Sequence, residues 1–129
     1  MHAQAALITL LTVLLIALAM YLVGRARTRY QVHAPATTGN PAFERVFRAH
    51  QNTIEATVMF LPALWVATIY CNDFWAAMLG YAWLAGRAWY LAAYAHPSGK
   101  RGSGFMIAII ANAVLVGWSL ACIVPLLAS

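Results

Sequence analysis

Four apolar stretches alternate with short polar connections along the chain. A helix needs about 20 apolar residues, rising 1.5 Å each, to cross the hydrocarbon core of a bilayer. The pattern predicts four such helices, over residues 3–23, 41–70, 74–95 and 105–127. The predicted fold class is therefore all-α: an integral membrane four-helix bundle, with residues 1–129 forming a single membrane domain.

Polar and turn-forming residues mark the ends of these helices. Asn40 is a good N-cap and Pro41 a good first helical residue. Residues 24–40 predict a basic first loop, residues 71–73 a tight turn, and residues 96–104 a short basic third loop. At about 30 residues, the second helix is longer than the bilayer is thick, so we expect its first turns to lie in the headgroup region or beyond it.

The composition supports a membrane protein and excludes other classes. Apolar residues make up 64% of the chain, charged residues 9%, and the mean hydropathy is +0.73. A soluble domain carries about a quarter charged residues. The balance excludes a disordered chain, a nucleic-acid-binding module and a water-exposed single-domain enzyme. We therefore expect the lipid bilayer, and no nucleic acid, as a partner.

The net charge of +5 is unevenly placed between the two ends of the predicted bundle. Cytoplasmic loops of membrane proteins carry an excess of Lys and Arg. We therefore expect loops one and three, residues 24–40 and 96–104, in the cytoplasm and both termini outside. The cationic, loop-poor design of the chain suggests a bacterial inner membrane as the location. The cations that fall on the predicted cytoplasmic side are Arg25, Arg27, Arg29, Arg45, Arg48, Lys100 and Arg101.

Cysteine and histidine residues predict little chemistry here. Cys71 and Cys122 are too few for a disulfide framework or a cysteine-based zinc site. We expect both to be small apolar fillers in helices. The four histidines are scattered, with no pair at helical spacing beside carboxylates, so no metal site is expected.

Polar residues within two predicted spans need an explanation, because a charge at membrane depth costs roughly 2.5–3.5 kcal/mol on insertion scales. Arg48, Asn52 and Glu55 follow one another at i, i+4 and i+7. At 100° per residue they lie within about 60° of one another, so they form one polar stripe on the second helix. A similar stripe on the third helix comprises Arg87, Tyr90 and Tyr94.

These two stripes are typical of a pocket for a zwitterion with excess negative charge. Arginines would bind carboxylates, Glu55 an ammonium group, and Asn52 and the tyrosines amide dipoles. A purely structural interpretation stays open. Arg48 and Glu55 could pair to hold helices together, and Arg87 is the residue most suited to a packing role inside the bundle.

The segment 38–55, T-G-N-P-A-F-E-R-V-F-R-A-H-Q-N-T-I-E, resembles the signature of the MAPEG family, the membrane-associated proteins in eicosanoid and glutathione metabolism. The resemblance continues through residues 64–67, Gly86, Arg87 and the two tyrosines, and so covers nearly the whole chain. It is greatest to the branch that holds leukotriene C synthase and the microsomal glutathione transferases.

The resemblance implies a glutathione site between the subunits of a homotrimer. Glutathione would be the co-substrate, and a lipophilic electrophile would enter from the bilayer. Arg101 matches the arginine that stabilises the glutathione thiolate and is the expected catalytic residue. Its guanidinium would need to supply roughly 2.7 kcal/mol to lower the thiol pKa by about two units. The residues implied to bind glutathione are Arg27, Arg48, Asn52, Glu55, Tyr90 and Tyr94.

Departures from the family pattern narrow the expected activity. Thr28, His50 and Ala56 stand where leukotriene C synthase has an arginine, a glutamine and a tyrosine. We therefore expect a glutathione transferase, which could also reduce lipid hydroperoxides, without leukotriene synthesis. A non-catalytic lipid-binding or partner-presenting member is the alternative, but it would not need Arg101. A small four-helix exporter is less favoured, because its acidic residue would lie in the first span, which here carries no charge.

Overall fold

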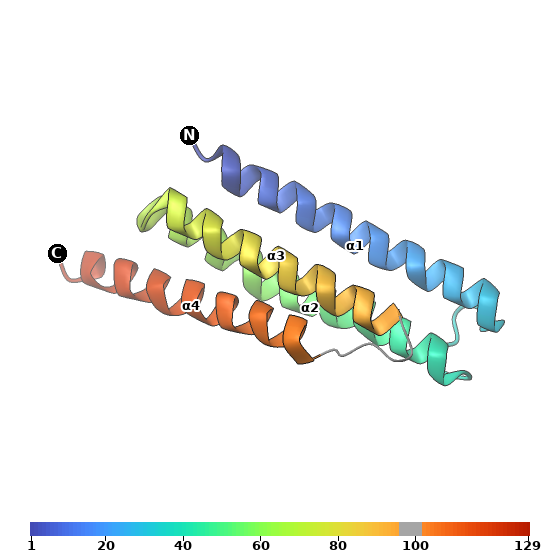
Figure 1. The fold of residues 1–129 in the computed structure, drawn as a ribbon. Coiled ribbons are helices and arrows are strands. Elements are labelled where there is room, and N and C mark those ends of the chain that lie inside the picture. The colour runs from blue at the N-terminus through green and yellow to red at the C-terminus, as the bar shows by residue number, and fades with distance from the viewer. Residues whose placement is uncertain (96–101) are drawn as a thin grey trace.

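The computed structural model describes residues 1–95 and 102–129, which form a bundle of long helices running alternately up and down (Figure 1). The helices are α1 (Ala3–Tyr30), α2 (Pro41–Tyr70), α3 (Asp73–Ala95) and α4 (Gly102–Leu127). Both termini and the α2–α3 turn lie at one end of the bundle, and the α1–α2 connection lies at the other. The predicted all-α four-helix fold is confirmed.

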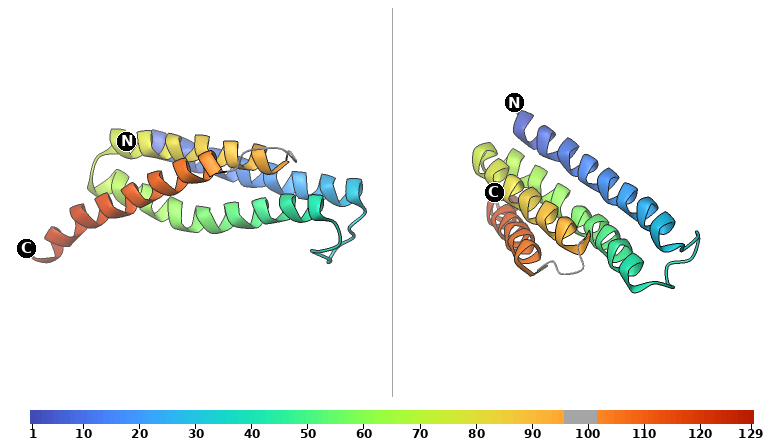
Figure 2. Two further views of the ribbon diagram at one scale, coloured as in Figure 1. Left: turned by 60° about the horizontal axis from the view of Figure 1, so that its bottom comes forward. Right: turned by 45° about the vertical axis from the view of Figure 1, so that its right-hand side comes forward.

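The centre of the bundle is the pair α2 and α3, each of which packs against all the other helices. In the described part of the chain, α1 and α4 flank this pair and make no contact with each other. The rings of Phe60 and Trp83, both fully buried, stack in parallel with centroids 3.8 Å apart at the α2–α3 interface. Figure 2 shows α4 tilted away from the other helices toward its C-terminus.

Three helices of the described chain, α1, α2 and α4, are long and apolar enough to cross a membrane. The fourth predicted span, residues 74–95, forms a helix of the expected extent but is not among those three. The reason is composition, since α3 carries Arg87 together with several tyrosines, tryptophans and glycines of low hydropathy. Its position between α1 and α4 explains how such a helix is accommodated, because other helices cover much of it.

The end of α1 differs from the prediction. The helix continues through Tyr30, seven residues beyond the predicted end at position 23, so the loop is only residues 31–40. Hydropathy falls where the chain leaves the bilayer, but alanine and arginine are good helix formers and the helix continues into the polar region. It ends at Gln31, whose left-handed backbone lets its N–H donate to the carbonyl of Arg27.

The predicted start of α2 is confirmed. The Asn40 side-chain oxygen accepts hydrogen bonds from the backbone N–H groups of Ala42 (2.8 Å) and Phe43 (3.3 Å), and Pro41 is the first helical residue. This cap fixes the first turn of α2 and thereby the rotation of the polar stripe that follows it.

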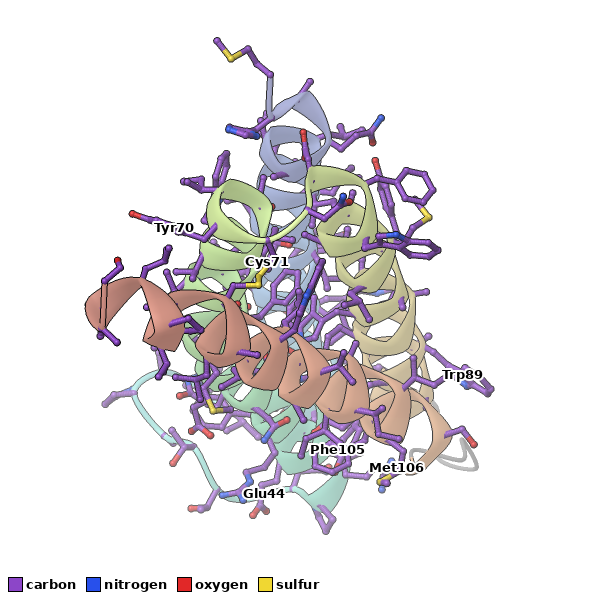
Figure 3. The ribbon with its side chains drawn as sticks, turned by 90° about the vertical axis from the view of Figure 1, so that its left-hand side faces the viewer. Glu44, Tyr70, Cys71, Trp89, Phe105 and Met106 are labelled. Atoms are coloured by element: carbon purple, nitrogen blue, oxygen red, sulfur yellow. A yellow bond between two sulfur atoms is a disulfide. The ribbon has the colours of Figure 1, made fainter. Side chains whose placement is uncertain are left out.

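The expectation that the cysteines are separate apolar fillers is wrong. Cys71 and Cys122 form a disulfide bond, with Cα atoms 5.8 Å apart (Figure 3). Cys71 ends α2 at the tight turn into α3, and this turn lies against α4 near its C-terminal end. The bond therefore links α4 covalently to the end of the bundle that holds both termini.

Candidate functional site

The two polar stripes face the same space at the end of the bundle remote from the disulfide. Asn40 and the first turns of α2 place Arg48 and Asn52 beside the last turns of α3. Together with the start of α4 they line an open cavity of about 340 Å³. Its lining residues are Arg48, Asn52, Tyr90, Tyr94, Gly102 and Phe105.

A smaller, deeper cavity of about 190 Å³ adjoins the first, because Asn52 and Phe105 line both. Its polar lining comes from three helices: Asn52 and Glu55 on α2, Arg87 on α3 and Asn112 on α4. Four of the five predicted glutathione-binding residues on the two stripes therefore meet at the larger cavity, and the fifth, Glu55, joins them through the smaller one.

Arg87 is the most buried charged residue of the described chain, at 2% exposure. Its Nη1 and Nη2 both donate to Asn52 Oδ1 at 3.2 Å, and Nη2 donates to Thr53 Oγ1 at 2.7 Å. Its guanidinium carbon lies 4.1 Å from the centroid of the Tyr90 ring. The packing role foreseen for Arg87 is thus visible, but its partners are an amide, a hydroxyl and a ring.

The other members of the stripes differ in exposure. Tyr90 is buried and Tyr94 half-buried, and their ring centroids lie 4.6 Å apart. Arg48 and Glu55 are exposed on the surface of the single chain. No ion pair joins them within the described residues, where the structure records only the pair of His2 and Asp73. Their charges are therefore free to face a ligand or a neighbouring chain.

Arg27 does not join this cluster in the single chain. Its Nη1 donates to the backbone oxygens of Val32 (3.2 Å) and Ala36 (2.8 Å), and its guanidinium lies over the ring of Phe43. It therefore holds the segment that follows α1 against the start of α2. Its expected contact with glutathione stays a prediction. Arg101, the expected catalytic residue, lies outside the described residues.

The contribution of α4 was not foreseen. Phe105 lines both cavities, and Asn112 brings an amide into the deeper one. Asn112 Oδ1 is buried and has no hydrogen-bond partner in the described part of the chain. A lone amide in an otherwise apolar span was the available signal for Asn112. Nothing in the sequence pattern indicates which way Phe105 faces.

An apolar groove of about 700 Å³ between α2 and α4 continues from the deeper cavity toward the opposite end of the bundle. Met59 lines both the groove and the deeper cavity, so the two adjoin at its side chain. Other groove residues include Pro62, Val66, Val116 and Leu120. Polar and apolar spaces thus meet near the middle of the bundle.

Comparison with known proteins agrees with the pattern of the site. The sequence pattern of the MAPEG family matches residues 5–121. An uncharacterised protein of Synechocystis sp. is 45% identical over 86% of this chain and 81% of its own length. Human microsomal glutathione S-transferase 2 is 43% identical over 74% of this chain. Guinea pig (Cavia porcellus) leukotriene C4 synthase is 43% identical over 77% of this chain.

The aligned region spans 66% of the length of both mammalian relatives. The family match nevertheless covers nearly the whole of this chain, from α1 to the last turns of α4. The resemblance seen in the motif of α2 is thereby confirmed along the chain. The protein is an integral membrane protein, and it belongs to the MAPEG family.

Proposed function

We propose that the chain is a membrane-bound glutathione transferase, which binds glutathione at a subunit interface, stabilises its thiolate and conjugates it to a lipophilic electrophile. The observation that carries this proposal is the convergence of Arg48, Asn52, Tyr90 and Tyr94 on one cavity, with Glu55 beside it. Family relatives that are named as a glutathione transferase and a leukotriene C4 synthase support it.

Glutathione fits the chemistry of these side chains. It carries two carboxylates and one ammonium group, so its net charge is negative and suits a site with more cations than anions. The guanidinium of Arg48 can bind a carboxylate through two parallel hydrogen bonds. The carboxylate of Glu55 can bind the ammonium group, and the amide of Asn52 and the tyrosine hydroxyls can bind the peptide groups.

Catalysis requires the glutathione thiol to lose its proton, because the thiolate is the nucleophile. We assign this role to Arg101, whose charge would stabilise the sulfur anion. The thiolate can attack an electrophilic carbon to form a thioether, while the bond from that carbon to its leaving group breaks. It can instead attack the terminal oxygen of a lipid hydroperoxide, which breaks the O–O bond and gives a glutathione sulfenic acid and an alkoxide that takes up a proton to become the alcohol. A second glutathione then reduces the sulfenic acid, which gives glutathione disulfide and water. Both reactions begin from the same anion, so a transferase of this kind can also act as a peroxidase.

The lipophilic co-substrate would reach the thiolate from the bilayer. The apolar groove between α2 and α4 meets the deeper cavity at Met59, which offers a route from lipid to the polar groups. Binding both reactants in adjoining spaces raises their effective concentration. We propose a homotrimer, in which the exposed Arg48 and Glu55 of one subunit meet residues of the next; Arg27 would then reach the site from a neighbouring subunit.

We further propose that the end of the bundle that carries the arginines faces the cytoplasm, where glutathione is abundant and thiols stay reduced. Among the described residues, the cations of α1 and α2 gather at the α1–α2 connection, opposite the termini. The disulfide lies at the other end, which suits an oxidising compartment. The position of the cations and the position of the disulfide therefore favour the same orientation of the bundle in the membrane.

The test is the ultraviolet thiolate absorbance on mixing detergent-solubilised protein with glutathione. We expect a thiolate signal from the wild type and none from Arg101→Ala, with glutathione still bound by both. Bound glutathione without a thiolate signal from the wild type would favour a non-catalytic binding protein. If the wild type binds no glutathione, the proposed function is wrong.

A further inference from the structure

Arg87 contacts two residues of the proposed glutathione site without reaching the larger cavity itself. It donates to Asn52 and stacks on Tyr90, and both of these line that cavity. Its remaining hydrogen bond goes to the buried Thr53. Within the described residues no carboxylate lies at ion-pair distance from it. A buried cation with neutral partners is costly in a membrane protein, so its presence calls for a function.

The donor chemistry of Arg87 decides how the Asn52 amide is turned. A guanidinium carries only donors, whereas an amide side chain has an acceptor end, Oδ1, and a donor end, Nδ2. Because Oδ1 accepts from both terminal nitrogens of Arg87, Nδ2 must point away from the guanidinium. Nδ2 donates no hydrogen bond within the described residues, and Asn52 borders both cavities.

We propose that Arg87 is a positioning residue, which fixes the Asn52 amide so that its Nδ2 group donates to an oxygen of bound glutathione. The acceptor is a carboxylate or peptide carbonyl oxygen, and it meets a donor that is already oriented. The inference rests on the proposed function, because it names what Arg87 does for that ligand. Without Arg87 the amide can rotate, and the ligand loses an oriented donor.

The first test is a double-mutant cycle on the full-length protein, with glutathione affinity measured by calorimetric titration in detergent. We expect Asn52→Ala and Arg87→Met each to weaken glutathione binding by about tenfold or more. In the Arg87→Met background, adding Asn52→Ala should weaken binding by less than about threefold, since the amide is already misplaced. Two fully additive losses would overturn the proposal.

A second variant keeps Arg87 and therefore does not depend on the folding of a protein without its buried cation. Asn52→Asp gives the guanidinium a carboxylate partner but has no donor for the ligand. We expect the melting temperature to be held or raised while glutathione affinity falls at least about tenfold. If the Asn52 Nδ2 group does not donate to glutathione, this variant will bind glutathione as the wild type does, and that result would overturn the proposal.

Thr53→Val is the matched control, because it removes the 2.7 Å bond to Arg87 and leaves the contact with Asn52. We expect its glutathione affinity to stay within about threefold of the wild type. A loss of glutathione affinity as large as that of Arg87→Met would show that general packing around Arg87 determines the affinity. That result would overturn the positioning role. If the wild type binds no glutathione, this inference and the proposed function are both wrong. If the wild type binds glutathione but the losses of affinity in the two single variants are additive, only this inference is wrong.

Discussion

Gly86 and Gly104 pack backbone against backbone where α3 meets the start of α4. A Cβ atom on Gly86 would lie 2.8 Å from the carbonyl oxygen of Gly104 and 2.9 Å from the backbone nitrogen of Ala108. A Cβ on Gly104 would lie 2.7 Å from the backbone nitrogen of Tyr90. Small residues let helices in a membrane approach this closely. The approach brings Phe105 to the site, one residue after Gly104.

We predict that Gly86→Ala destabilises the protein by about 1–3 kcal/mol, because the new methyl group meets rigid backbone and the two helices must separate. It should also weaken glutathione binding, since α4 forms one wall of the cavity. Thermal unfolding in detergent and calorimetric titration measure the two effects. Gly117→Ala is the control: a Cβ there meets nothing within 4 Å, so no loss is expected. Equal unfolding temperatures for Gly86→Ala and wild type would contradict the close packing.

Reducing the Cys71–Cys122 bond should lower the unfolding temperature. The bond closes a loop with a sequence separation of 51 residues. On the chain-entropy estimate such a loop is worth about 4 kcal/mol, and less where the unfolded chain keeps its helices in the membrane. We expect reductant to lower the melting temperature of the wild type and to leave a Cys71→Ser, Cys122→Ser double variant unchanged. A wild type that a maleimide labels fully before reduction would show that the bond is absent.

Glu55→Gln should weaken glutathione binding by about 1.5–3 kcal/mol, because the amide cannot compensate the charge of the ammonium group. The exposed position of Glu55 makes a large effect on folding unexpected. Titration with glutathione measures the change. Glu44→Gln is a matched control from the same helix, since Glu44 lies in the first turn of α2 and lines neither cavity. Affinities that are equal in the Glu55→Gln variant and the wild type would remove Glu55 from the ligand site.

Asn112→Leu should raise the unfolding temperature. The Oδ1 atom of Asn112 is buried without a hydrogen-bond partner in the described part of the chain, and replacing such a group by an apolar one of similar size removes an unfavourable term of about 1–3 kcal/mol. Thermal unfolding measures the change. Asn72→Leu is the contrasting variant, because it removes the 3.0 Å hydrogen bond from the backbone N–H of Trp75 to Asn72 Oδ1 and should lower the unfolding temperature. A lower unfolding temperature for Asn112→Leu would indicate that the amide has a partner in the assembled protein.

The parts of the fold that follow from local chemistry could be predicted. The start of α2 follows from its sequence because asparagine followed by proline is a recognisable N-terminal cap of a helix. The two stripes could be found because helical spacing determines which side chains share a face. The end of α1 could not be predicted. Hydropathy indicates where the chain leaves the membrane, but the helix continues beyond that point to Tyr30.

Features that depend on how the helices pack against one another could not be predicted from the sequence pattern. The disulfide needs the α2–α3 turn to lie against α4, and two cysteines 51 positions apart give no sign of this. The same holds for Phe105, whose direction follows from the glycine contact of α3 with α4. The residue type and depth of Arg87 alone indicate a packing role, but its effect on the Asn52 amide follows only from the hydrogen-bond geometry.

The disulfide also has a consequence for the biogenesis of the protein. Cys71 leaves the ribosome long before Cys122, which lies in α4. The two thiols can meet only after α3 has been synthesised and α4 has docked beside the α2–α3 turn. An oxidised chain is therefore one in which α4 is already docked against the α2–α3 turn, and the shift between reduced and oxidised bands on a gel reports the time at which α4 docks.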